Sequence, residues 1–320
     1  MPEGAKARMQ WALDNAWADS TLEKYKYGVD AFLNFCEEAG IPSKQRIPVS
    51  EELLCCFAAS RAGEIAGGTA RSAVAAVKAW HIRRGAPWKG GLRLRYTLKG
   101  VENLKPESSK REERPPATEE MINILERELD LDDPKDAAVF AAACSAFWGQ
   151  IRLGEMLSDT QSKYFLGRIP VGADLGPAAT AAGTRVLKLP WTKTKGERGD
   201  KAILCRQRTK SDPVNAMENH VAVNDVPADL PLFAYRNENR DHICLSRRKF
   251  LLRCNEIWSR HGIPSTTGHS FRIGGTTHLL IAGVNPEVVQ AMGRWKSDAF
   301  LVYWRRLDIL APLHAEFLDL

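Results

Sequence analysis

The 320-residue sequence lacks any apolar run that approaches the roughly 18 residues needed to cross a bilayer. Its first residues do not show the charged-then-apolar pattern of a secretory signal peptide, so we expect neither a membrane protein nor a secreted one. The seven cysteines are an odd number and contain no CxxC pair, which argues against a disulfide framework and against a zinc site. We therefore expect reduced thiols and no bound metal.

Acidic residues are also missing where basic residues gather. Between Ile65 and Val101 there are eight basic residues and no acid, and the segment 185–210 holds nine basic residues against two acids. Patches of one sign indicate a polyanion that several elements grip together, whereas solvated helix faces are the simpler alternative. The basic residues that we expect to contact this polyanion are Arg71, Lys78, Arg83, Arg84, Arg93, Arg95, Arg247 and Arg248.

The first 104 residues predict a helical domain. Ser20 to Glu23 form a capping-box pattern, and the apolar residues that follow are spaced for one face of a helix that ends near Gly40. Further helices are expected from Ser50 to about Ala62, from Thr69 onward, and near Leu92 to Leu104. Short helices with a cationic stretch are typical of a clamp for a nucleic-acid duplex.

Residues 105–117 are charged, contain prolines and lack apolar periodicity, so we expect a linker between domains at 1–104 and 118–320. In the second domain, helices are predicted from Thr118 and from Pro134 to about Trp148. Residues 185–189 alternate like a strand that returns through residues 202–204 across a polar turn. Residues 172–183 read as a loop, and the chain after Phe233 reads as helices. The expected fold class is mainly α with a small β-hairpin.

Several residues suit the chemistry of a phosphodiester. His269 and Arg272 are three residues apart, so on a helix they share a face and converge on one small anion. Arg152 ends a largely apolar segment, and two arginines can place guanidinium forks on the non-bridging oxygens of one phosphate. A lysine in the turn 193–195 could protonate a leaving oxygen. Tyr303, brought to the same phosphate among cations, would be a nucleophile.

Each of these residues alone is more often structural, but their order along the chain is specific. Across the C-terminal two thirds, the order arginine, lysine, His-x-x-Arg, tyrosine resembles the catalytic domain of the tyrosine recombinases, the phage-integrase family. The sequence is most similar to the versions found in fungal Crypton-type mobile elements. The positions that match the family are Arg152, Lys193 with Lys195 as the alternative, His269, Arg272 and Tyr303.

One position departs from the family pattern. The family's second histidine or tryptophan normally follows a glycine directly, and here Arg294 follows Gly293, with Trp295 next. We favour Trp295 for this role, with an indole N–H that reaches the phosphate. The alternative is Arg294, which would give the site a third guanidinium.

The resemblance implies a helical core-binding (SAM-like) domain followed by a mixed, mostly helical catalytic domain. It implies DNA recombination and integration, in which Tyr303 forms a 3′-phosphotyrosine intermediate, Arg152, Arg272 and His269 hold the phosphate, and Lys193 acts as the leaving-group acid. No cofactor is implied, and the expected assembly is a homotetramer on two sites in double-stranded DNA. A type IB topoisomerase-like enzyme and a DNA-binding protein that no longer cuts are the alternatives. In a eukaryote, the nucleus is the expected location.

Overall fold

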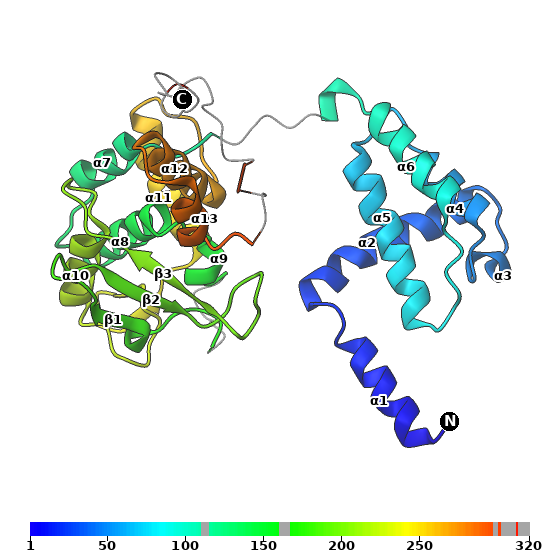
Figure 1. Ribbon diagram of the computed structural model, residues 1–320, viewed down its shortest axis with the longest axis horizontal. Coiled ribbons are helices and arrows are strands. Elements are labelled where there is room, and N and C mark those ends of the chain that lie inside the picture. The colour runs from blue at the N-terminus through cyan, green and yellow to red at the C-terminus, as the bar shows by residue number, and fades with distance from the viewer. Residues whose placement is uncertain (110–114, 160–166, 297–299, 302–311, 313–320) are drawn as a thin grey trace, which may run out of the picture. The chain divides into compact units, whose positions relative to one another are not determined.

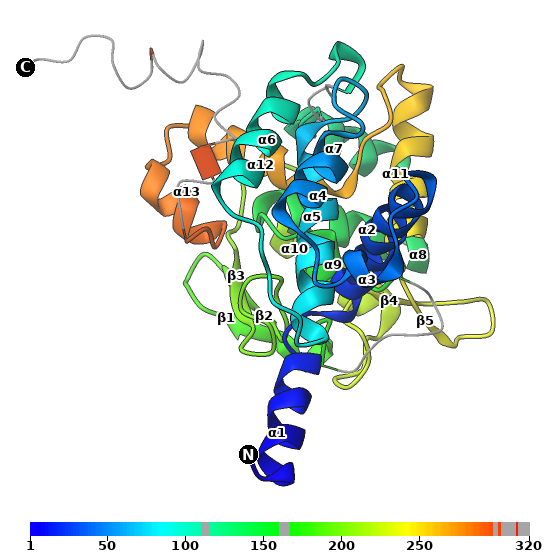
Figure 2. The same cartoon turned by 90° about the vertical axis from the view of Figure 1, so that its right-hand side faces the viewer.

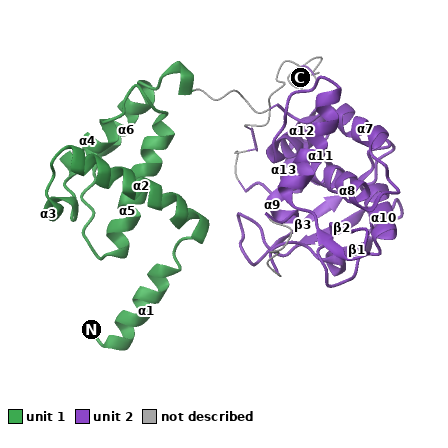
Figure 3. Cartoon of the chain, turned by 180° about the vertical axis from the view of Figure 1, so that it is seen from behind, with its two compact units in different colours: residues 1–112 green, residues 113–320 purple. Residues whose placement is uncertain are grey.

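The computed structural model describes residues 1–109, 115–159, 167–296, 300, 301 and 312 (Figure 1). The chain forms two compact units, Met1–Glu112 and Glu113–Leu320 (Figure 3). The division falls within the segment 105–117. Tyr303 lies outside the described residues. Among the described residues, no helix is both long and apolar enough to cross a membrane.

Unit 1 is helical. Its core forms where α2 packs against α5 and where α4 packs against α6, with the rings of Phe32 and Phe57 meeting edge to face at 5.2 Å between centroids. The helices of unit 1 are α1 (Glu3–Asp14), α2 (Asp19–Glu38), α3 (Ser43–Arg46), α4 (Glu51–Ala59), α5 (Gly67–Arg83) and α6 (Leu92–Asn103), followed by the 3₁₀ turn η1 (Glu107–Ser109).

The helix starts in unit 1 only partly follow the sequence signals. Ser50 caps α4 as its position suggests, because its side chain accepts a hydrogen bond from the Leu53 N–H at 3.1 Å. The capping box at Ser20 was a wrong prediction, since α2 already begins at Asp19 and has no side-chain cap. Helix α1 buries none of its residues and extends from the rest of unit 1 (Figure 1, Figure 2).

Unit 2 is mixed but mostly helical, as expected. Its helices are α7 (Glu119–Glu128), α8 (Pro134–Trp148), α9 (Leu153–Met156), the 3₁₀ turn η2 (Gly172–Asp174), α10 (Pro213–Asn224), α11 (Arg247–Arg260), α12 (Gly268–Ile281) and α13 (Pro286–Met292). Its strands are β1 (Leu175–Ala178), β2 (Arg185–Leu189), β3 (Asp200–Leu204), β4 (Ala234–Arg236) and β5 (His242–Cys244).

Helix α8 is the centre of unit 2 and contacts α7, α10, α11 and α12 (Figure 1). The Asp133 side chain caps its first turn, and its alanine-rich surface lets neighbouring helices approach closely. The closest approach is at α12, where a Cβ added to Gly275 would lie 1.9 Å from the Phe147 carbonyl oxygen. This packing fixes the C-terminal end of α8 beside the first turns of α12.

The predicted hairpin is confirmed, with Arg185 opposite Leu204 and Leu189 opposite Asp200. Strand β1 adds a third antiparallel strand in a segment that we expected to be a loop. Its sequence, Leu-Gly-Pro-Ala, carries no β-branched or aromatic residue, so local propensity gives no sign of a strand. The expectation of helices alone after Phe233 was also wrong, because β4 and β5 form a second hairpin whose three-residue strands are too short to show alternation.

Candidate active site

Arg152 lies in the short connection between α8 and α9, where it is the residue preceding the first turn of α9. Its Nη1 donates to Oε1 of Glu155 at 2.6 Å, and the Glu155 side chain is only 2% exposed. A carboxylate buried to this extent needs cationic partners. The Arg152 side chain remains 24% exposed, so it reaches the surface while its guanidinium is bonded to Glu155.

Arg294 is the second partner of that carboxylate. Its Nη2 lies 3.3 Å from Oε2 of Glu155, and its side chain is 5% exposed. Burial lowers the pKa of the Arg294 guanidinium, the negative charges of Glu155 and Asp200 raise it, and the charge of Arg152 lowers it again. Arginine starts from so high a pKa that the group stays protonated at neutral pH. Glu155 therefore holds two guanidinium groups close together.

Arg272 is fully buried in the first turns of α12. Its Nη1 donates to the carbonyl oxygen of Gln150 at 2.6 Å, and its Nη2 donates to the carbonyl oxygen of Gly293 at 2.5 Å. The Trp295 ring covers the guanidinium, with Cζ of Arg272 4.0 Å from the ring centroid, which is a favourable cation–π distance. Trp295 also fills the space above Gly293, where a Cβ would lie 1.4 Å from its ring.

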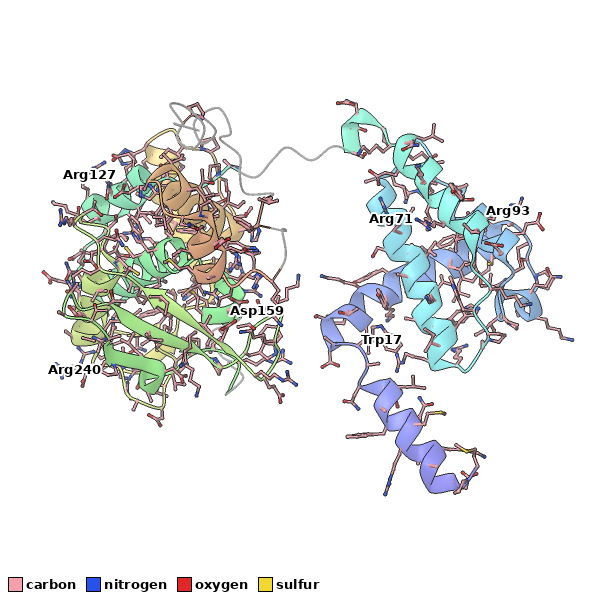
Figure 4. The ribbon with its side chains drawn as sticks, in the orientation of Figure 1. Trp17, Arg71, Arg93, Arg127, Asp159 and Arg240 are labelled. Atoms are coloured by element: carbon pink, nitrogen blue, oxygen red, sulfur yellow. The ribbon has the colours of Figure 1, made fainter. Side chains whose placement is uncertain are left out.

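His269 lies one turn before Arg272 and opens onto a groove of about 500 Å³. The same groove is lined by Arg152 from the start of α9, by Arg247 and Arg248 from α11, and by Gly268 at the N-terminus of α12. A helix N-terminus presents N–H groups and partial positive charge, so this groove suits an anion. Asp159 is the acid on its rim, and it forms an ion pair with Arg247 (Figure 4).

The two candidate lysines lie at the tip of the β2–β3 hairpin. Main-chain hydrogen bonds of 3.1 and 2.8 Å between Thr192 and Gly196 close this tip. Lys195 is held by an ion pair of 2.7 Å with Asp200, whereas Lys193 is exposed and makes no ion pair with any residue that the structure describes. The hairpin tip therefore carries one lysine that is paired with a carboxylate and one that is exposed to solvent.

Asp200 lies at the turn end of the hairpin, where it pairs with Leu189. Burial acts to raise the pKa of its carboxyl group, but the hydrogen bond from Lys195, the Lys201 main-chain N–H and the charges of Lys195 and Arg294 outweigh burial and leave the pKa below its usual value. The carboxylate therefore stays ionised and holds Lys195.

No protein-family model matches the sequence, and no curated protein matches it. Several solved structures have a fold similar to that of this chain. The Tn1549 transposon integrase in complex with transposon right end DNA shares 14% identity at a TM-score of 0.55, covering 93% of this chain and 92% of that chain. The XerH site-specific recombinase bound to its palindromic difH substrate also shares 14% identity, at a TM-score of 0.52, covering 91% and 78% of the two chains.

A further structure of the Tn1549 integrase, in complex with circular intermediate DNA, shares 16% identity at a TM-score of 0.52 and covers 93% of this chain and 92% of that chain. This chain has the recombinase fold. The likeness covers both units, so the recombinase fold extends beyond the region that carries the matched motifs.

In this recombinase fold, four of the six basic residues predicted in unit 1 line two grooves. Arg71 and Arg95 line a groove of about 420 Å³ between α5 and α6, and Arg71 pairs there with Glu102 at 2.5 Å. Arg83 and Arg84 line a separate groove of about 420 Å³, together with residues of α1 and α2. Figure 4 labels Arg71 on α5 and Arg93 on α6. All six basic residues that we predicted in unit 1 are exposed.

Sequence reasoning missed two residues that organise the site of this recombinase fold. Gln150 supplies a carbonyl oxygen to both Arg272 and Arg294, and Asp200 holds Lys195. Gln150 has no residue-type signal, because a main-chain carbonyl is the same in every residue. Asp200 is one of two acids in a basic segment, and the sequence alone does not show which lysine it pairs with. Among the described residues, no group of three histidine, cysteine or acidic side chains is placed to bind a metal ion.

Proposed function

We propose that this chain is a site-specific DNA recombinase, an integrase of a mobile element that cleaves and rejoins DNA through a 3′-phosphotyrosine at Tyr303. The observation that carries this proposal is the guanidinium cluster of Arg152, Arg272 and Arg294, joined through Glu155 and the Gln150 carbonyl. Three cations fixed next to an anion-binding groove suit the charge that develops on a phosphodiester under attack. The similarity of the fold to that of the Tn1549 transposon integrase supports this role for the cluster.

In the proposed reaction, the Tyr303 oxygen attacks phosphorus and the bond from phosphorus to the 5′ oxygen breaks. The phenol proton passes to His269, and Lys193 supplies a proton to the departing 5′ oxygen, which leaves as a hydroxyl. The phosphodiester bond is replaced by a phosphotyrosine bond, so rejoining is the reverse of cleavage and requires no nucleotide cofactor. Arg152 and Arg272 neutralise the non-bridging oxygens.

Arg294 and Trp295 have different contacts, which supports separate roles for them. Arg294 shares Glu155 with Arg152, so we assign it the role of a third guanidinium at the phosphate. Trp295 lies on the face of Arg272, so its role is to hold that side chain and to cover it until DNA is bound. From the sequence alone we favour Trp295 as a direct phosphate ligand; from these contacts we propose Arg294 for the phosphate and Trp295 for Arg272.

The expected partner is double-stranded DNA, gripped by the exposed basic residues of unit 1 and by Arg247 and Arg248 of unit 2. The similar integrase and XerH structures contain DNA, and one of these proteins is a transposon integrase. These likenesses support a mobile element as the source, of which the Crypton type is the proposed class. Two crosswise strand exchanges need four active sites, so a homotetramer on two DNA sites is part of the proposal.

The proposal is tested with nicked suicide duplexes from the DNA that flanks the coding sequence and from a randomised pool. The native chain is expected to form a covalent adduct that resists detergent, and Tyr303→Phe is expected to form none. An adduct in the variant would refute the nucleophile. An absence of adduct with the native chain, alongside retained DNA binding, would favour a binding protein. Relaxation of supercoiled plasmid by a monomer would favour the topoisomerase-like alternative.

A further inference from the structure

Gln150 combines two unfavourable features at one position. Its φ is 48°, in the left-handed region that residues other than glycine seldom adopt, and its side chain is fully buried. Its Nε2 has no hydrogen-bond partner among the described residues. A left-handed backbone is unfavourable for a residue other than glycine, and a buried amide donor without a partner lowers the stability of the fold. Such costs gather where function requires them.

The main-chain carbonyl of Gln150 binds two arginine side chains. Its carbonyl oxygen accepts from Nη1 of Arg272 at 2.6 Å and from Nη2 of Arg294 at 3.2 Å, while the preceding carbonyl of Gly149 accepts from Nη1 of Arg294 at 3.2 Å. These carbonyls lie at the C-terminal end of α8, where the helix dipole is negative and favours cations. Two like charges are thus held side by side in a buried place by one peptide segment.

The side chain of Gln150 ties the same segment to α12 at a second point. Its Oε1 lies 2.9 Å from the hydroxyl oxygen of Thr276, one turn after Arg272, and the single proton of that hydroxyl is shared between Oε1 and the Arg272 carbonyl oxygen at 2.8 Å. Both the head group of Arg272 and the helix that carries it are therefore fixed relative to Gln150. A left-handed backbone at this residue turns its carbonyl towards the arginines immediately after α8 ends.

We propose that Gln150 is a positioning residue, whose carbonyl and side-chain tether set the spacing of Arg272 and Arg294 for the scissile phosphate. This inference rests on the proposed function, because the phosphate is the anion that the two guanidinium groups would share. Gln150 does not touch DNA in this proposal. Its contribution is to keep two guanidinium groups in place before the substrate arrives, which avoids reorganisation in the transition state.

The test separates positioning from stability. Gln150→Gly keeps the carbonyl and relieves the backbone strain but removes the tether, so the melting temperature should hold or rise while single-turnover cleavage falls about 10- to 100-fold. Asp225→Gly is the matched control, since Asp225 has a φ of 46° at the end of α10. We expect the control to be as stable or more stable, with native cleavage. Native cleavage by Gln150→Gly would overturn the proposal.

A neutral scissile group gives the second readout. A methylphosphonate at the scissile position removes one negative charge for the arginines to neutralise, so the deficit of Gln150→Gly relative to the native chain should shrink to less than about threefold. A deficit of the same size on both substrates would overturn positioning through the arginines.

The third readout does not depend on cleavage. Side-chain N–H signals of labelled arginines report exchange with water, and two slowly exchanging guanidinium groups in the native chain should exchange faster in Gln150→Gly. If the native chain forms no adduct but these signals change, positioning stands and the recombinase function fails. If the signals do not change, positioning fails whatever the adduct assay shows.

Discussion

The arginines of the two units look alike in the sequence but differ in how they are held. In unit 1, Arg93 and Arg95 are exposed on α6, and Arg71 keeps 55% of its side chain in solvent although it pairs with Glu102. In unit 2, Arg272 is fully buried and Arg294 is 5% exposed. The first group can follow a flexible polyanion, whereas the second is fixed by carbonyl groups and by Glu155.

This difference separates two kinds of electrostatic contribution. Exposed cations neutralise backbone phosphates with little demand on geometry, so their effect is spread over many residues and depends on salt. Fixed cations stabilise the charge of one transition state, and their effect is concentrated in a few residues. Counting basic residues cannot distinguish the two groups, but burial and hydrogen-bond partners do.

The largest expected effect is the loss of cleavage in Arg272→Ala, a variant of the fixed group. Removal of a fixed guanidinium should lower single-turnover cleavage about 10³-fold, roughly 4 kcal/mol in activation free energy, while DNA affinity stays within about threefold. Adduct formation on suicide duplexes and filter binding at several salt concentrations measure the two quantities. The double variant Arg93→Ala/Arg95→Ala is the control from the exposed group.

For that control, DNA affinity should fall about tenfold, and the slope of log affinity against log salt should decrease by about 2, because two phosphate contacts are lost. Cleavage at saturating protein should remain native. Equal losses of binding and cleavage in both variants would remove the distinction between the two groups.

The next prediction concerns the free energy of unfolding. It compares an ion pair whose carboxylate is buried with an ion pair on the surface. Arg253 on α11 holds Asp136 on α8 through two bonds of 3.0 and 2.7 Å, and Asp136 is 6% exposed. Asp136→Asn should lower the free energy of unfolding by about 3 kcal/mol, because both charge-assisted hydrogen bonds from Arg253 lose their charged acceptor and Arg253 keeps only Glu256, at 3.3 Å, as a partner. In Glu120→Gln, which breaks the exposed pair of Glu120 with Arg127, thermal unfolding should be unchanged. Similar melting temperatures for both variants would contradict this reasoning.

The smallest of the three effects compares the two lysines of the hairpin tip. Lys193→Ala should lower cleavage about 100-fold, because the 5′ oxygen loses its acid, whereas Lys195→Ala should change cleavage less than threefold. In a substrate with sulfur in place of the 5′ oxygen, the leaving group is a thiolate that needs no proton. This substrate should therefore restore cleavage by Lys193→Ala. If Lys195→Ala has the larger defect and is the variant that sulfur restores, the lysine fixed by Asp200 is the acid.

The sequence predicts the helices whose signals are local. A long apolar segment marks α8, Ser50 marks the start of α4, and alternation marks β2 and its return through β3. It misses β1, β4 and β5, since these strands are formed by pairing with partners rather than by their own propensity. It also misplaces the start of α2, where the main chain begins the helix without a side-chain cap.

For the candidate site, residue types predict which groups are present but not how they are connected. Arg152, Arg272 and His269 could be proposed from spacing, and Arg294 and Trp295 from their neighbourhood. That Glu155 joins Arg152 to Arg294, and that the Gln150 carbonyl joins Arg294 to Arg272, depends on contacts between segments more than 120 residues apart. Such contacts follow from the packing of α8 against α12, which no local pattern encodes.

That packing has a mechanical consequence. A Cβ on Gly274 would lie 1.8 Å from the Ala117 carbonyl oxygen, and one on Gly275 would lie 1.9 Å from that of Phe147. Turning α12 about its axis by a single residue would drive a side chain into one of these backbones. The helix that carries His269 and Arg272 is therefore fixed against rotation, and any movement of these two residues relative to α8 must come from their side chains.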